Sequence, residues 1–153
     1  MSQPITFDST TPRFGLPHLF PAQAQKEFIV NESHALIDTL LHCAVEGEAN
    51  DPPAAPADGE VWIVGPAPTG EWNGRAGQLA GRQAGAWLFV PPRTGTRVFD
   101  KEARQLALHD GQWRRAPVPE APAGGTTIDA EARAAIESLV ETLRLARVLP
   151  RTQ

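Results

Sequence analysis

The chain has 153 residues, of which 41% are apolar and 21% are charged, so it is long enough to bury one core and is neither disordered throughout nor a low-complexity fibre. Its single cysteine, Cys43, excludes an intrachain disulfide and a cysteine-rich zinc site. No apolar run approaches the ~20 residues of a membrane span, and the start lacks the pattern of a signal peptide, so we expect synthesis in the cytoplasm.

The formal net charge of −4 is distributed unevenly along the chain. Residues 1–60 hold two basic and nine acidic side chains (−7), residues 61–119 eight and four (+4), and residues 120–153 four and five (−1). The basic part contains all four tryptophans, Trp62, Trp72, Trp87 and Trp113. Cationic side chains interleaved with indoles are typical of surfaces that bind anionic glycans or single-stranded nucleic acid. The short basic runs and the acidic overall balance make nucleic acid the weaker of these two partners.

A first helix is predicted in the proline-free stretch between Ala22 and Asp51. Apolar residues recur there at helical spacing, which predicts one buried face. Asn31 is a suitable N-cap and Gly47 a suitable residue after the last turn. The sequence therefore predicts a helix over about 31–46.

Between residues 51 and 116 the periodicity changes to short runs separated by turn signals, which predicts a small antiparallel β-meander. Asp110-Gly111 predicts a hairpin with a two-residue type I′ turn. A small internal repeat links two hairpins that each carry a tryptophan just past the turn: Gln78-Leu79-Ala80 recurs as Gln105-Leu106-Ala107, and Gly85-Ala86-Trp87 as Gly111-Gln112-Trp113. The predicted strands are 60–64, 78–82, 87–90, 96–99, 105–109 and 112–115.

A second helix of about 21 residues is predicted after the Pro/Gly-rich linker 117–125. Thr126 and Asp129 resemble a capping box at its start. Its apolar stripe has to be covered, either by its own domain or by other copies of the chain. The residues predicted to mediate oligomerisation are Ile128, Ala132, Ile136, Leu139 and Leu143. The fold class is therefore α+β, with an N-terminal part (1–50), a β domain (51–116), the linker and a C-terminal helix (126–153).

The tryptophans are the first candidates for function, because an indole face can stack on a sugar ring. Trp62 and Trp87 have apolar neighbours, which favours the core. Trp72 lies in a loop and Trp113 precedes two arginines, so each suits either the core or a ligand-binding surface. The candidate glycan-binding residues are Trp72, Trp113, Arg75 and Arg114.

No catalytic constellation and no metal-ligand motif is recognisable, so we expect a protein that is not an enzyme and that needs neither cofactor nor metal. Asp100 and Glu102 are interpreted as solvated acids near a turn, and Cys43 as a packing residue.

Several separate motifs occur in an order that resembles a phage- and prophage-associated family catalogued as a domain of unknown function. They lie between Thr11 and Trp113 and include Thr11-Pro12-Arg13-Phe14-Gly15, Gly59-Glu60-Val61-Trp62-Ile63-Val64-Gly65, Thr69-Gly70-Glu71-Trp72 and Pro92-Arg93-Thr94-Gly95. The segment from Ile128 to Ile136 is similar to the tail of members found in the head-spike fibres of alphaproteobacterial gene transfer agents, which are phage-like particles.

This resemblance implies a structural virion-type protein, such as a spike or fibre subunit that forms a homotrimer. One end would bind a spike-base or capsid protein and the other the surface polysaccharide of a recipient cell, without inserting into a membrane. Such a protein is released when the producing cell lyses. The alternative is an assembly or connector protein without a ligand of its own. A third interpretation is a polysaccharide depolymerase.

Overall fold

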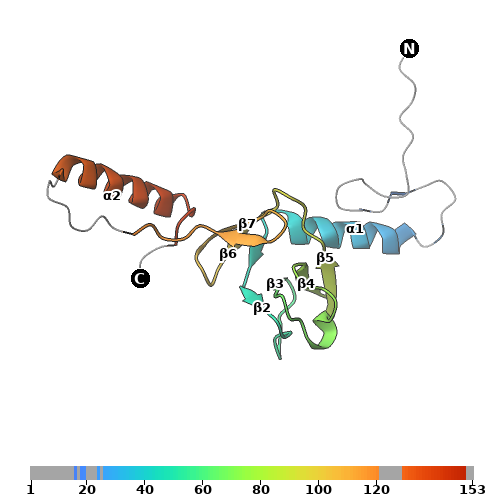
Figure 1. The fold of residues 1–153 in the computed structure, drawn as a ribbon. Coiled ribbons are helices and arrows are strands. Elements are labelled where there is room, and N and C mark those ends of the chain that lie inside the picture. Colours follow the sequence, from blue (N-terminus) through green and yellow to red (C-terminus); the bar gives the residue numbers. More distant parts are fainter. Residues whose placement is uncertain (1–15, 17, 20–23, 25, 121–128, 151–153) are drawn as a thin grey trace, which may run out of the picture.

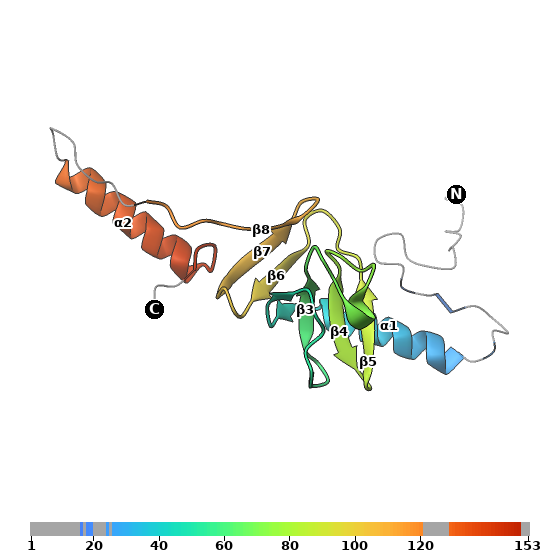
Figure 2. The ribbon, with the colours of Figure 1, turned by 60° about the horizontal axis from the view of Figure 1, so that its bottom comes forward.

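The protein has an α+β architecture, as the sequence predicts (Figures 1 and 2). The computed structural model describes residues 16, 18–19, 24, 26–120 and 129–150. One helix lies at each end of the molecule, with the strands between them. In chain order the elements are α1 (Lys26–Leu40), β1 (Ala44–Val45), β2 (Glu48–Ala49), β3 (Val61–Val64), the 3-10 helix η1 (Gly70–Trp72), β4 (Leu79–Gln83), β5 (Ala86–Val90), β6 (Arg97–Asp100), β7 (Gln105–His109), β8 (Trp113–Arg115) and α2 (Ala130–Leu145).

Helix α1 begins and ends earlier than the sequence predicts. Asn31 lies inside the helix rather than at its N-cap, and Gly47 lies between β1 and β2. The helix ends where His42 adopts a left-handed φ of 52°, a conformation that is more common for glycine. Near its C-terminal end α1 packs against β4, where a Cβ at Gly81 would lie only 3.1 Å from the Thr39 hydroxyl. Glycine at this position is what lets the helix approach the strand closely.

The strands form two four-stranded sheets rather than the single meander that the sequence predicts. Sheet 1 has the order β1-β6-β7-β8 and sheet 2 the order β2-β3-β4-β5. In each sheet a two-residue parallel strand extends a three-stranded antiparallel meander. Because β1 and β2 precede residue 51, the β region begins at Ala44, within the part predicted to form the N-terminal lead-in and helix.

The two sheets are built on the same plan, and the sequence repeat occupies equivalent places in both. Leu79 pairs with Ile63 in sheet 2, and its counterpart Leu106 pairs with Phe99 in sheet 1. The tryptophans are equivalent too. Trp87 lies opposite Arg82, four residues after Gln78, and Trp113 lies opposite His109, four residues after Gln105.

The short parallel strands complete this correspondence. Ile63 donates its backbone N–H to the carbonyl oxygen of Gly47 at 3.0 Å, and the equivalent Phe99 donates to Cys43 at 2.9 Å. One continuous stretch of seven residues, 43–49, thus supplies an edge strand to each sheet. The chain crosses from one sheet to the other within this stretch.

The two hairpins of the repeat differ in their turns. The β4–β5 hairpin has the two-residue loop Ala84-Gly85, and both residues have positive φ angles, 49° and 75°, as a type I′ turn requires. The β7–β8 hairpin has a three-residue loop, 110–112, in which Gly111 has a φ of 76°. The predicted two-residue type I′ turn at Asp110-Gly111 is therefore wrong, although the hairpin itself is present.

The two sheets stack on each other, but the face that sheet 1 turns toward the shared core is not the counterpart of the face that sheet 2 turns toward it. Leu79 of sheet 2 and Ala107 of sheet 1 share one core, whereas Ala80, the counterpart of Ala107, points away from sheet 1 and packs against Trp72. Trp72 therefore seals the outer face of sheet 2. The buried residues of the shared core are Leu36, Cys43, Val45, Val61, Ile63, Leu79, Val90, Val98 and Ala107.

Helix α2 has 16 residues rather than about 21. Asp129 is its N-cap, because the carboxylate accepts a hydrogen bond from the N–H of Ala132 at 2.9 Å. Thr126 of the predicted capping box lies outside the described residues. No helix in the described part of the chain is long and apolar enough to cross a membrane.

The residues that follow α2 attach it to sheet 1. Arg147 adopts a left-handed φ of 59°, and its carbonyl oxygen accepts a hydrogen bond from the N–H of Leu106 at 2.7 Å. Leu149 is buried with 3% exposure. In Figure 2 the extended segment after β8 runs alongside α2, and Pro119 and Glu120 line a hollow together with residues of the helix. The helix is therefore held at the edge of sheet 1 with one side covered.

Candidate functional site

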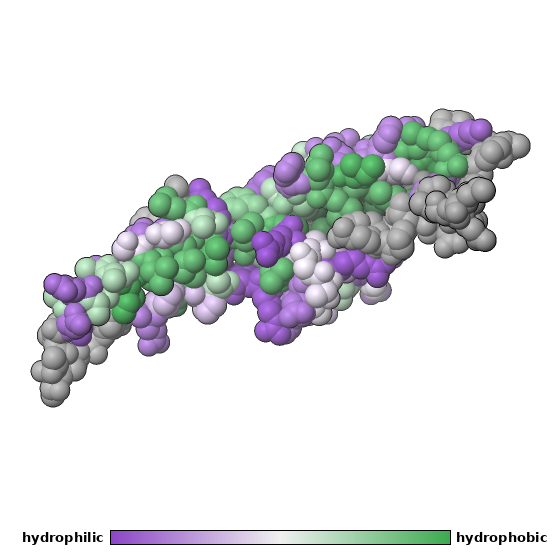
Figure 3. Space-filling view, turned by 90° about the horizontal axis from the view of Figure 1, so that it is seen from above, coloured by the Kyte–Doolittle hydropathy of each residue, from purple (hydrophilic) through white to green (hydrophobic). Residues whose placement is uncertain are grey.

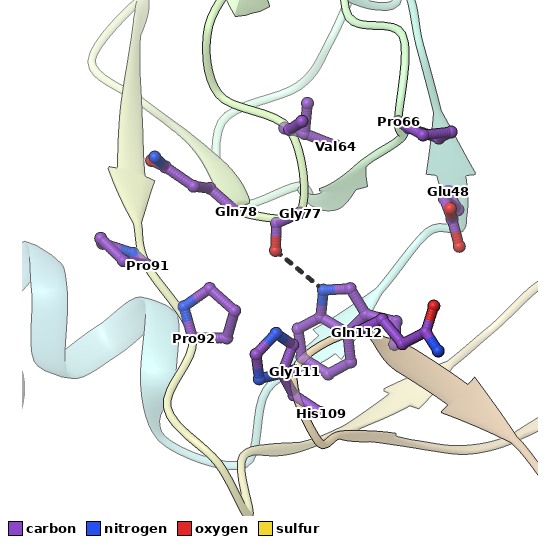
Figure 4. A pocket seen from close by; sticks show the side chains of 12 residues that line it. Glu48, Val64, Pro66, Gly77, Gln78, Pro91, Pro92, His109, Gly111 and Gln112 are labelled. Atoms are coloured by element: carbon purple, nitrogen blue, oxygen red, sulfur yellow. Dashed lines mark hydrogen bonds between the residues drawn. The ribbon is translucent and has the colours of Figure 1, made fainter.

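A cleft of about 600 Å³ opens between the two sheets, where the β7–β8 hairpin meets the residues that precede β4 (Figure 4). Its walls carry rigid apolar rings: Pro91 and Pro92 lie on one side, and Pro66 lies on the other, close to Glu48. This volume lies within the range of about 300–1,000 Å³ that is typical of small-molecule sites.

Trp113 connects the two sheets inside this cleft. Its indole N–H donates a hydrogen bond to the carbonyl oxygen of Gly77 at 2.9 Å, from sheet 1 to the segment that leads into sheet 2. The ring also meets His109 edge to face, with centroids 5.2 Å apart and an interplanar angle of 67°. The indole therefore has a fixed position, and its one donor is already satisfied.

Two polar atoms in the cleft are buried without a hydrogen-bond partner among the described residues. They are Oε1 of Gln78 and Nδ1 of His109. An unsatisfied buried polar atom costs about 1–3 kcal/mol, and an ordered water or a small movement of either side chain would satisfy it.

A chain of charged groups joins the sheets beneath the cleft. The Arg115 guanidinium contacts Oε2 of Glu48 at 3.0 Å and Oδ2 of Asp100 at 2.5 Å. Burial acts to lower the pKa of Arg115, but the hydrogen bonds and charges of the two carboxylates outweigh burial and raise that pKa above its ordinary value. Asp100 is 2% exposed, so its interpretation as a solvated acid is wrong: from the end of β6 its carboxylate accepts a hydrogen bond from Arg115 of β8, two strands away in the sheet.

The structure does not bring the four predicted glycan-binding residues together. Trp113 lines the cleft. Trp72 is fully buried, with its ring 5.1 Å from that of Trp87, so its predicted availability for stacking is wrong. Arg75 is exposed and lies over the ring of Phe89 at 4.9 Å, outside the cleft.

Arg114 belongs to a different surface. It lines a groove of about 350 Å³ on the outer face of sheet 1, beside the partly exposed Leu108 and Val148. Trp62 and Trp87, predicted for the core, are half-buried and pack against the cluster around Trp72.

Sequence reasoning missed the polar residues of the cleft. Glu48, Gln78 and His109 come from three separate elements or connections, and the sequence shows no local pattern that unites them. The internal repeat does contain one signal, because it places His109 and Arg82 at equivalent positions, each opposite a tryptophan.

The predicted oligomerisation residues lie on α2, where none of the helix residues is buried. Ala132, Ile136 and Leu139 are exposed, the last by 59%, and Leu143 is half-buried. Ile128 lies outside the described residues. In the space-filling view of Figure 3, apolar side chains gather toward both ends of the elongated molecule, one of which carries α2 and the other α1.

Neither metal binding nor thiol chemistry is indicated by the described residues. They contain no group of three or more His, Cys, Asp or Glu side chains that is placed to hold a metal ion. Burial raises the pKa of the Cys43 thiol to about 11, so the thiol is protonated at neutral pH and is a poor nucleophile.

Fold and site together define a small α+β protein built from two equivalent sheets, with a polar cleft at their junction. Residues 30–114 match the family model described as "Protein of unknown function (DUF2793)". This match covers more than half of the chain, and the protein belongs to that family. No curated protein sequence matches the chain.

Proposed function

We propose that the protein is a structural spike or fibre subunit of a phage-like particle, such as a gene transfer agent, and that it binds cell-surface polysaccharide. The observation that carries the binding part of this proposal is the cleft, in which the polar side chains of Glu48, Gln78, His109 and Gln112 line the walls together with Trp113 and three prolines. Polar groups next to a ring and rigid apolar walls suit a sugar, which has hydroxyl groups on its edge and C–H groups on its faces.

The particle part of the proposal rests on the resemblance of the ordered motifs, from Thr11 to Trp113, to a phage- and prophage-associated family. On this view the protein is made in the cytoplasm, joins a spike-base or capsid protein, and leaves the cell on lysis. Binding without turnover is expected, so incubation of polysaccharide with the protein should release no new reducing ends.

Helix α2 supports a homotrimer as part of the same proposal. The side of the helix away from Pro119 and Glu120 carries exposed small and apolar residues at the alternating spacing of three and four that favours helix association: Ala132, Ala135, Leu139, Thr142 and Ala146. Leu139→Asp is expected to shift the mass in light scattering toward the monomer. Ala134→Asp, on the opposite side of the helix, is the control and should leave the mass unchanged.

The second candidate is a connector that assembles into a particle without a ligand of its own. The exposed apolar side chains at both ends favour it, including Phe28 on α1 with 65% exposure and Leu145 on α2 with 69%. A connector is expected to bind a base protein of the particle. Substitutions in the cleft should then leave the affinity for that base protein unchanged.

The deciding experiment measures binding of the purified full chain to capsular polysaccharide, with acapsular cells as the negative control. Gln112→Trp places a large ring at the exposed mouth of the cleft and is expected to weaken binding at least about tenfold. Ala86→Trp is the matched control, because Ala86 holds the equivalent exposed place in the sister hairpin, outside the cleft. If both variants bind capsule equally well, the cleft is not the binding site. If the unmodified chain does not bind capsule at all, the connector is favoured.

A further inference from the structure

The charges around the cleft limit which saccharides it can accept. Among the described residues that line it, Glu48 is the only one with a charged side chain. The cation that compensates Glu48 is Arg115, which also contacts Asp100. No lysine or arginine is among the described residues that line the cleft, so a ligand carboxylate or sulfate would meet a like charge there, an arrangement that costs several kcal/mol in a protein interface.

The polar side chains at the opening of the cleft include a carboxylate and an amide. Glu48 uses one oxygen for Arg115 and has the other available, and Gln112 presents an exposed amide. Oε1 of Gln78 and Nδ1 of His109 are buried in the wall of the cleft. The Trp113 N–H is engaged by Gly77 and does not serve the ligand. Such a set fits hydroxyl groups, each of which donates one hydrogen bond and accepts others.

The walls and the rigidity of the site suit a pyranose ring. Pro91 and Pro92 face the cleft with apolar C–H groups and lose little conformational freedom when a ligand packs on them (Figure 4). The hydrogen bond from Trp113 to Gly77 and the ion pair from Arg115 to Glu48 fix the two sheets relative to each other. A site held in this way does not have to be ordered by its ligand, which favours binding.

We infer that the inter-sheet cleft selects a neutral, hydroxyl-rich saccharide unit and rejects an acidic one. This inference rests on the proposed glycan binding and names its ligand class. It also reverses the sequence-based expectation of an anionic glycan, because most of the basic side chains between residues 61 and 119 lie away from the cleft.

The test titrates the full chain, observed by NMR, with matched disaccharides of glucose, galactose and mannose and with their counterparts that end in a uronic acid. Neutral disaccharides are expected to shift the His109 and Trp113 signals, and their acidic counterparts to bind about tenfold more weakly or worse. Glu48→Gln removes the charge and keeps a hydrogen-bond acceptor, so it should reduce the difference in affinity between the neutral and the acidic disaccharides. Glu46→Gln is the matched control, since Glu46 pairs with Lys101 outside the cleft.

Capsular polysaccharide whose uronic acids have been reduced to hexoses separates this inference from the proposed function. Tighter binding of the reduced polymer than of the native polymer, lost in Gln112→Trp, supports the inference. Preference for the acidic saccharides, or failure of every disaccharide and of the reduced polymer to bind, overturns it. If neutral disaccharides bind in the cleft while capsule does not bind, the inference stands and adhesion to capsule fails. If acidic capsule binds through the cleft, adhesion stands and the inference fails.

Discussion

Sheet 1 and sheet 2 have the same plan, yet Trp113 of sheet 1 lines a cleft, whereas the equivalent Trp87 of sheet 2 packs against the buried Trp72. The difference arises in the connections between their first two antiparallel strands. In sheet 2 the connection from β3 to β4 is long enough to place η1 and Trp72 over the outer face, where Trp87 packs. In sheet 1 the equivalent connection from β6 to β7 is a short turn, and the equivalent face meets sheet 2 instead.

The two sheets differ at a pair of equivalent positions next to the cleft. Equivalent positions carry Arg82 and Trp87 in one sheet, with the guanidinium 5.1 Å from the ring, and His109 and Trp113 in the other. In sheet 2 a cation lies over the ring of the tryptophan. In sheet 1 an imidazole takes the place of that guanidinium, its Nδ1 has no hydrogen-bond partner among the described residues, and the cleft lies at the junction of the two sheets.

The largest expected change in stability comes from removing Trp72, which covers the outer face of sheet 2. Trp72→Ala should lower the free energy of unfolding by about 3–5 kcal/mol, because it removes a fully buried indole. Urea denaturation measures the loss. Trp62→Ala, at a half-buried position packed on the same cluster, is the comparison and should cost clearly less. Equal losses would mean that Trp72 does not organise the outer face of sheet 2.

The next effect concerns the ion pair that sheet 1 has in place of an apolar contact. Asp100 ends β6 as Val64 ends β3, and Asp100→Ala should cost about 3 kcal/mol by leaving Arg115 poorly compensated. The double variant Asp100→Val/Arg115→Leu, which copies the apolar character of sheet 2, should recover part of that loss. A double variant no more stable than Asp100→Ala would contradict this account.

A pH effect distinguishes the two edge strands, because Cys43 of sheet 1 corresponds to Gly47 of sheet 2. Burial raises the pKa of the folded thiol to about 11 from an ordinary 9.0, so the unfolded chain loses this proton first as pH rises. The free energy of unfolding should therefore be unaffected by Cys43 below pH 9 and fall between pH 9 and 11 by up to about 2–3 kcal/mol. Cys43→Ala should remove this part of the decline, and an identical pH profile for both chains would refute the assignment.

The smallest effect separates the two hairpins. Ala84 has a positive φ in the type I′ turn of sheet 2, where asparagine is favoured. Ala84→Asn should stabilise the protein by about 0.5–1 kcal/mol, seen as a rise in melting temperature. Asp110→Asn in the three-residue loop of sheet 1 lacks that strain and should change the melting temperature little. A larger gain from the Asp110 variant would reverse the comparison.

The sequence predicted those features whose cause is local. The strand 105–109 was predicted with the bounds that β7 has, because its apolar run lies between clear turn signals. The separation into two sheets was not predictable in this way, since β1 is two residues long and its partner Phe99 lies 55 residues from Ala44. Long-range parallel pairing of so short a strand leaves no periodicity to detect.

In the candidate site, too, the sequence indicated only what depends on local features of the chain. Trp113 was a candidate because it precedes Arg114 and Arg115, and it lines the cleft. The roles of Gln78 and His109 depend on how the sheets stack, and the burial of Trp72 depends on a loop that folds back over sheet 2. These relations arise from tertiary packing, which overrides the local preference of a polar or loop residue.

The order in which the chain visits the sheets decides how it carries tension between its ends. Helix α1 leads directly into β1, and α2 is attached to β7 through Arg147 and Leu106, so both helices act on sheet 1. Sheet 2 is a side branch of this load path, because the chain enters it after β1 and leaves it before β6. A pull on the two helices is thus resisted by the β1–β6 ladder of sheet 1 and, through the contact of α1 with β4, by sheet 2 as well.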